Sequence, residues 1–175
     1  MTSASPGSLP DPADNPKLYR AQLIAVVGDR DPLAIIDSTP RVIRELIEGV
    51  DEEALNRRPT SEEWSVSGIV GHLLDDEIIN AFRLRLTLTG DQAHYPGTDP
   101  ERWAALAKPP VHEMLTALEG LRTYHVTLLR SLDDRDWDRT GLHEEQGPES
   151  VEIQILKNAG HDLAHLDQLK RCLNG

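Results

Sequence analysis

The chain has 175 residues and carries 30 acidic against 18 basic side chains, which gives a formal net charge of −12. This length fits one domain that buries a sizeable core without the help of disulfides. Because few cations are present to neutralise phosphate groups, nucleic acids and anionic membrane surfaces are excluded as main partners.

Two further features indicate a cytoplasmic protein. The chain has a single cysteine, Cys172, so no intramolecular disulfide can form and a reducing compartment is favoured. The N-terminal residues lack the apolar stretch and the positive charges of a secretory signal. The longest apolar run near the start, AQLIAVVG at 21–28, is far shorter than a membrane span.

The first residues differ in composition from the rest. Residues 1–16 are rich in Ser, Pro, Asp and Ala, which bury little apolar surface, so we expect a disordered tail. Residues 17–175 are expected to form one domain. It begins with a short helix over 17–28, which Gly28 and the polar residues after it would end.

The next segment contains two signals for the start of a helix. One lies at Asp31 and Pro32. At the other, Thr39 can cap a helix whose first position is Pro40. The apolar residues that follow recur at the spacing of an amphipathic helix, so we expect the first long helix over 39–50.

Three more long helices are expected further along. Ser65 is a suitable N-cap for a helix over 66–89, a second helix follows Pro110, and the last covers 149–173. Residues 91–110 are rich in proline and are expected to form a long surface connection, with one helical turn around Trp103.

No segment has a convincing alternating strand pattern with turn signals. The predicted fold class is therefore all-α, an antiparallel four-helix bundle with long interhelical loops.

The last helix carries a polar stripe on one side. Its members are Gln154, Asn158, His161, His165, Gln168 and Cys172. The two histidines are four residues apart, so their rings point the same way and can reach one metal ion. Two solvated or hydrogen-bonded histidines would have the same spacing, and that alternative stays open.

A third histidine, His72, lies among apolar residues in the helix over 66–89. Asp75 and Asp76 are on nearby positions and could accept the second N–H of its ring, as carboxylates do beside metal-bound imidazoles. Asp162 falls in the apolar sector of the last helix, where a carboxylate is costly without a partner. We expect it to orient His72 or to bind a backbone donor.

Other charged or titratable residues are weaker candidates. His143, before the last helix, could lie at the mouth of a site, although an exposed loop histidine is the plainer interpretation. His125 lies on the apolar seam of its helix and could approach a metal, or serve as a hydrogen-bonded core residue. Arg83 and Arg122 could bind an acidic substrate, although most helical arginines form surface ion pairs.

Two segments carry a resemblance to a known family. RPTSEEWSVSGIVGHLLDDE and GLHEEQGPESVEIQILKNAGHDLAHLDQLKR resemble the DinB-like, or YfiT-like, superfamily of four-helix-bundle metal proteins, and the resemblance extends from about residue 39 to the C-terminus. It implies that His72, His161 and His165 bind a divalent metal, commonly nickel or zinc. Three protein ligands imply an open coordination position of the catalytic kind. No catalytic residue is assigned.

The resemblance also implies an activity. The expected function is that of an S-transferase that joins a low-molecular-weight thiol, such as mycothiol or bacillithiol, to a small electrophile, because a metal stabilises the thiolate nucleophile. One alternative is a metal-dependent hydrolase that activates water. Another is a non-catalytic metal-binding or stress-related bundle. Relatives of this kind also imply a homodimer.

Overall fold

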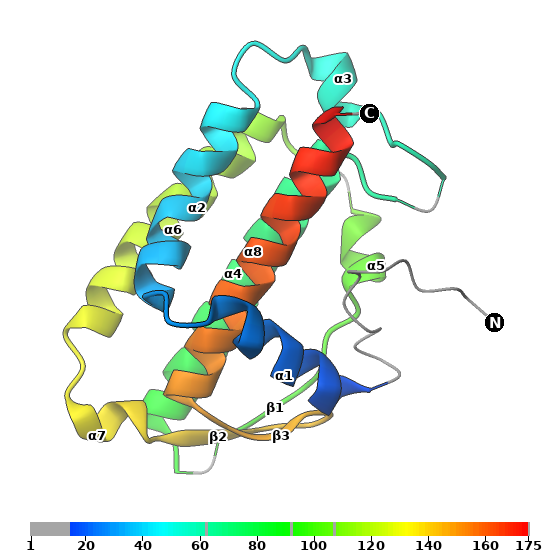
Figure 1. Ribbon diagram of the computed structural model, residues 1–175. Helices are drawn as coiled ribbons and strands as arrows, with labels where there is room; N and C mark the ends of the chain where they lie inside the picture. Colours follow the sequence, from blue (N-terminus) through cyan, green and yellow to red (C-terminus); the bar gives the residue numbers. More distant parts are fainter. Residues whose placement is uncertain (1–14, 62, 92, 107, 175) are drawn as a thin grey trace.

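A computed structural model describes residues 15–174, except residues 62, 92 and 107. Four long helices form the bundle: α2 (Pro32–Leu46), α4 (Val66–Thr89), α6 (Val111–Arg130) and α8 (Val151–Asn174). The predicted all-α four-helix bundle is confirmed. Figure 1 shows that α2 and α8 run in one direction and that α4 and α6 run in the other.

The course of the chain explains the long connection between α4 and α6. These two helices pack side by side and run parallel (Figure 1), so the chain must return along the bundle before α6 begins. Residues 90–110 make this return and include α5 (Pro100–Ala104), which is the helical turn expected near Trp103.

Local signals position the starts of the long helices. The Ser65 side chain accepts a hydrogen bond from the backbone N–H of Gly68 and caps α4, as its sequence predicts. Helix α6 begins directly after Pro110. Helix α8 begins two residues later than expected, because residues 147–150 form a strand.

The expected start of α2 at Thr39 is wrong. The helix begins at Pro32, with Asp31 as its cap, and continues through Pro40. Thr39 is therefore an interior residue, and its hydroxyl donates to the carbonyl of Ile35. Since proline has no N–H, the carbonyl of Ile36 loses its helical donor. It accepts a hydrogen bond of 3.3 Å from Arg122 instead, which compensates for the helical hydrogen bond that proline cannot donate.

A short helix, α1 (Pro16–Val27), packs against α8 (Figure 1). The contact is close at Gly160, where a Cβ atom would lie 2.1 Å from the carbonyl oxygen of Leu23. Asn15 caps α1 and Pro16 is its first residue, so the last two residues of the predicted tail belong to this helix and its cap. Residues 1–14, for which a disordered tail is predicted, lie outside the described residues.

The structure also contains strands, which the sequence analysis did not expect. They are β1 (His94–Tyr95), β2 (Thr140–His143) and β3 (Gly147–Ser150), in the order β1-β2-β3. Strand β2 pairs in parallel with β1 and antiparallel with β3. Segments of two to four residues are too short to display an alternating pattern. Together they cover the end of the bundle where α4 ends and α8 begins (Figure 1).

The two remaining helices are short: α3 (Glu52–Asn56) and α7 (Asp134–Trp137). Among the described residues, no helix has the length and apolar character needed to cross a membrane.

The core consists of two apolar clusters with charged residues between them. On α8, Ala159 belongs to one cluster and Leu166 to the other. Asp162 lies between these positions and is fully buried. Arg122 on α6 and Glu77 on α4 are also buried and fall between the two clusters along their helices. A buried charged layer therefore divides the core close to the histidines of α4 and α8.

Candidate metal centre

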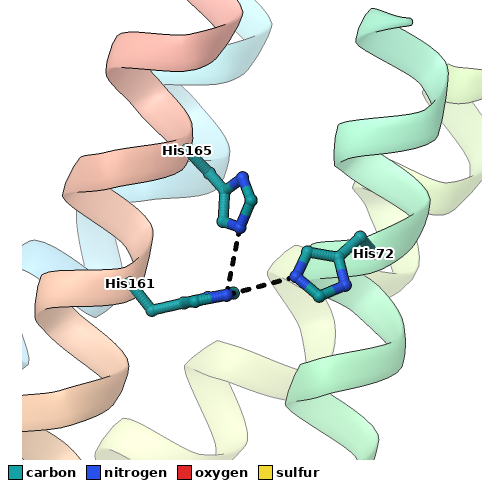
Figure 2. A group of neighbouring side chains, drawn as sticks. All are labelled: His72, His161 and His165. Atoms are coloured by element: carbon teal, nitrogen blue, oxygen red, sulfur yellow. Dashed lines mark hydrogen bonds between the residues drawn. The ribbon is translucent and has the colours of Figure 1, made fainter. Parts of the chain in front are cut away.

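Three histidine rings meet between α4 and α8. The Nε2 atom of His161 is the common partner of the other two rings (Figure 2), at 3.1 Å from Nε2 of His72 and 3.0 Å from Nε2 of His165. Three nitrogen ligands at ordinary zinc distances around one ion would be separated by roughly 3.3 Å. The structure thus brings together the three histidines that the sequence analysis singled out, at a spacing that suits a metal ion.

The donor set fits a cation better than it fits a hydrogen-bonded cluster. Burial lowers the pKa of His161 well below its usual value and lowers the pKa of His165 to about 3. A neutral imidazole has either one proton or one lone pair on Nε2. His161 therefore cannot form a good hydrogen bond to both neighbours, whereas a cation would accept the lone pairs of all three rings. The Nδ1 atom of His161 is buried and has no hydrogen-bond partner within the described residues.

Gln168 holds one of the rings in the required protonation state. Its side-chain oxygen lies 2.8 Å from Nδ1 of His165, so this nitrogen donates its proton to Gln168. The lone pair of Nε2 then faces the other histidines, which is how metal-binding histidines are usually oriented.

Trp64 covers one side of the cluster. Its ring lies edge-on to His72, at 4.7 Å between centroids, and stacks with His165 at 6.2 Å. Trp64 directly precedes the cap of α4, so the start of this helix fixes its position. An indole in this place excludes water from that side of the histidines.

Asp76 faces the histidines from their ligating side. Its Oδ2 atom lies 3.4 Å from Nε2 of His161 and 3.7 Å from Nε2 of His72. The side chain is 29% exposed, and burial of the carboxyl raises its pKa. Asp76 was a candidate to accept the second N–H of His72, but its carboxylate faces the Nε2 atoms of His72 and His161 instead.

The other two expected carboxylates bind cations. Asp75 pairs with Lys108 and has no histidine contact among the described residues. Asp162 binds Arg122 through two hydrogen bonds of 2.5 and 2.7 Å, so it does not orient His72 as expected. The reason is that α6 packs beside α4 and supplies a buried guanidinium, which compensates this carboxylate fully.

His125 belongs to the same charged layer and not to the histidine cluster. Its Nδ1 atom lies 2.5 Å from Glu77, which also binds Arg122, and its Nε2 atom lies 3.1 Å from Arg85. The interpretation of a hydrogen-bonded core histidine agrees with these contacts.

His143 is buried on β2 and is not an exposed loop residue. Its Nδ1 atom accepts hydrogen bonds from the backbone N–H groups of Glu145 and Gln146. Burial, together with the positive charges of Arg83 and Lys157, lowers its pKa to about 4. It serves to shape the β2–β3 turn, and its ring does not reach the three histidines.

Sequence reasoning missed Tyr19 on α1, whose side chain lies close enough to Asp76 for the two groups to interact electrostatically. The phenol is half-buried, and its burial and the charge of Asp76 raise its pKa. No local signal marks this residue, since only the packing of α1 on α8 brings it near Asp76. Lys157 was missed for the same reason: it is one turn before His161, and its ammonium binds Glu149.

The chain is similar to several known proteins. The sequence model of the DinB superfamily matches residues 35–169. A protein of Oceanobacillus iheyensis named "Putative metal-dependent hydrolase OB0782" is 31% identical over 143 residues, which cover 77% of this chain and 81% of that protein. A "Putative metal-dependent hydrolase" of Bacillus cereus is 29% identical over 144 residues, 79% of this chain and 83% of that protein.

A solved structure has a similar fold. YfiT from Bacillus subtilis superposes with a TM-score of 0.74 at 20% sequence identity, covering 89% of this chain and 86% of that one. It is described as "a probable metal-dependent hydrolase with an unusual four-helix bundle topology".

Proposed function

The chain belongs to the DinB superfamily, and from this we propose that it is a metal-dependent enzyme in which His72, His161 and His165 bind one divalent cation. The observation that carries the proposal is the convergence of three Nε2 atoms at 3.0 and 3.1 Å. Neutral imidazoles suit zinc or nickel, and three protein ligands leave a coordination position open. A divalent cation held there supplies Lewis-acid activation of a water molecule or of a thiol.

We propose hydrolysis of a small molecule as the reaction, in keeping with the names of the relatives. Asp76 is the group that takes the proton from the attacking water, since its carboxylate lies on the ligating side of the histidines. As the water oxygen bonds to the electrophilic carbon, the bond to the leaving group breaks, and the leaving group takes up the proton that Asp76 received from the water. Trp64 shields the histidines, and the Tyr19 hydroxyl is available to donate a hydrogen bond to a bound substrate.

A second candidate is transfer of a low-molecular-weight thiol, such as mycothiol or bacillithiol, to an electrophile. The same site would lower the pKa of a thiol, and Asp76 could accept its proton. Two cations that act on Asp76, Arg83 and Lys157, favour this candidate for a thiol that carries carboxylates, such as bacillithiol, because they could bind those carboxylates.

Metal analysis of protein purified without a histidine tag tests the metal site. We expect about one zinc or nickel ion per chain in the wild type and almost none after His161→Ala. His112→Ala is the matched control, because His112 is exposed on α6 and should leave the metal content unchanged. Wild-type protein that neither contains nor takes up a divalent metal would refute the proposal.

The reaction is tested with the metal-loaded protein on two panels. One contains small esters and amides, and the other contains halogenated electrophiles together with a thiol. Asp76→Asn should keep the metal and lose turnover by about a hundredfold or more, as expected for removal of a general base. Full turnover of this variant would contradict the role of Asp76. Products that contain a new carbon–sulfur bond would select the transferase over the hydrolase.

A further inference from the structure

We propose that Arg83, assisted by Lys157, binds a carboxylate group of the substrate beside the metal centre. The enzyme would then act on small organic acids whose reacting group lies at the histidines and whose carboxylate points towards the β-sheet. The inference rests on the proposed function, because it extends the same site.

Arg83 lies on the face of α4 that carries His72 and Asp76. His72, Asp76 and Arg83 are separated by four and seven residues on α4, which places them on one face of the helix. Arg83 therefore lies about 10.5 Å along the helix axis from Asp76. The charges of Arg83 and Asp76 act on each other.

Lys157 reaches the same region from the other helix. It is four residues before His161 on α8, so it shares a face with that histidine. Because α4 and α8 run in opposite directions (Figure 1), residues that follow His72 and residues that precede His161 lie towards the same end of the bundle. Both cations are therefore on the side of the metal centre that faces the strands.

Arg83 is a buried cation without a counter-charge in contact. Its side chain is only 9% exposed. One nitrogen donates to the carbonyl of Pro96 at 2.6 Å, and the guanidinium lies 5.4 Å from the centre of the Tyr95 ring. Within the described part of the chain, no carboxylate oxygen lies within 4.0 Å of it, and its other N–H groups have no hydrogen-bond partner. Burying a charge in this way is costly unless an anion binds there.

A comparison with Arg122 supports an anion from outside the protein as the partner of Arg83. Arg122 is the other buried arginine of the bundle, and it is bound by both Asp162 and Glu77. The fold therefore compensates a purely structural arginine with carboxylates of its own. Arg83 lacks such partners among the described residues, which indicates that its anion comes from outside the protein.

The acidic groups near Arg83 act on it only from a distance. Glu149 is buried, and both of its oxygens bind Lys157, at 2.7 and 2.9 Å. Glu149, Asp76 and Glu145 attract Arg83 electrostatically, but among the described residues no carboxylate oxygen lies within 4.0 Å of its guanidinium. Its N–H groups therefore remain available for direct contact with a small anion.

The guanidinium of Arg83 indicates which kind of anion binds there. A guanidinium presents parallel N–H groups that match the two oxygens of a carboxylate. The size is limited as well, because Gln154 on α8 and Thr87 on α4 form a hydrogen bond of 2.9 Å one turn beyond Arg83. A ligand that binds at both the histidines and Arg83 would therefore end at Arg83.

The test uses cobalt-loaded protein and two series of probes. The probes are ω-mercaptocarboxylates of increasing chain length and the corresponding ω-mercaptoamides, whose thiol binds cobalt and gives a charge-transfer absorption band. We expect the carboxylate to bind about tenfold or more tightly than its amide at one chain length, as a charge-assisted bidentate contact would produce. Arg83→Gln should abolish this preference while the protein still binds cobalt and the amide. Arg41→Gln, exposed on α2, is the control and should keep the preference.

The outcomes separate the two proposals. If cobalt binds but wild-type protein does not prefer carboxylates, or the preference survives Arg83→Gln, the inference is wrong and the metal site stands. If Arg83→Gln fails to fold, Arg83→Lys decides in its place and should reduce the preference. If cobalt does not bind, the proposed function fails, and the metal-free protein still tests the inference. Glutarate should then raise the melting temperature more than glutaramide does. Equal shifts in melting temperature with the two compounds would overturn the inference about Arg83.

Discussion

Arg122 and Asp162 form a bidentate ion pair in the centre of the bundle, with hydrogen bonds of 2.5 and 2.7 Å. Asp162 directly follows His161 on α8. Glu77 directly follows Asp76 on α4 and binds the same guanidinium at 3.2 Å. A single arginine on α6 therefore connects the two helices that carry the histidines and keeps their separation constant.

This ion pair predicts a large effect of Arg122→Met on stability. The variant would leave Asp162 and Glu77 buried without their cation, so we expect a loss of about 3–5 kcal/mol in the free energy of unfolding, measured with urea. Arg44→Met removes an exposed ion pair with Glu119 and should cost at most about 1 kcal/mol. Equal losses in the two variants would contradict the structural role of Arg122.

Gln168 is expected to control metal affinity through the protonation state of His165. Gln168→Leu removes the acceptor for the Nδ1 proton, and the affinity for zinc should fall about 10–100-fold. Gln168→Glu keeps an acceptor and should retain the affinity. Competition with a chromogenic chelator measures both. A loss of the same size in both variants would indicate a packing effect instead.

The contact of α1 with α8 predicts opposite effects at two glycines. Gly160→Ala would bring a Cβ atom to 2.1 Å from the carbonyl oxygen of Leu23, and the displacement of α1 should cost about 1–3 kcal/mol. Gly120 is exposed within α6 and has open space around it. Gly120→Ala should therefore stabilise the protein by about 1 kcal/mol. Thermal unfolding of both variants measures the two changes in stability. A Gly160→Ala protein as stable as the wild type would refute the close contact between α1 and α8.

Stability is expected to fall as the pH decreases, in part because of His143. Its pKa is about 4 in the folded protein against a usual 6.5, so only the unfolded chain takes up this proton between these values. The unfolded state is favoured increasingly from about pH 7 to about pH 4. His143→Asn retains an acceptor near the position of Nδ1 and removes the titration. Urea unfolding of this variant at several pH values should show a free energy of unfolding that depends less steeply on pH than that of the wild type. The control His112→Asn should keep the pH dependence of the wild type.

Much of the helical framework is predictable from short stretches of sequence. The start of α4 depends on Ser65 and that of α6 on Pro110, and both are local signals that act whatever packs against the helix. Pro40 misleads because its local signal is overridden: α2 continues through it, and a side chain from α6 satisfies the carbonyl that proline leaves free. The three strands are too short for any pattern.

The sequence by itself determined that His161 and His165 share one face, because that spacing is a property of the helix alone. It also singled out His72, as a histidine among apolar residues with carboxylates nearby, and the family resemblance then implied that His72 binds a metal. Only the tertiary structure decided the partners of the buried charges. Asp162 pairs with Arg122, Asp76 faces the ligating atoms, and Arg83 has no described carboxylate in contact. Helix spacing sets the direction of a side chain, but the charge it meets depends on which helix packs opposite, and that information is spread over the whole chain.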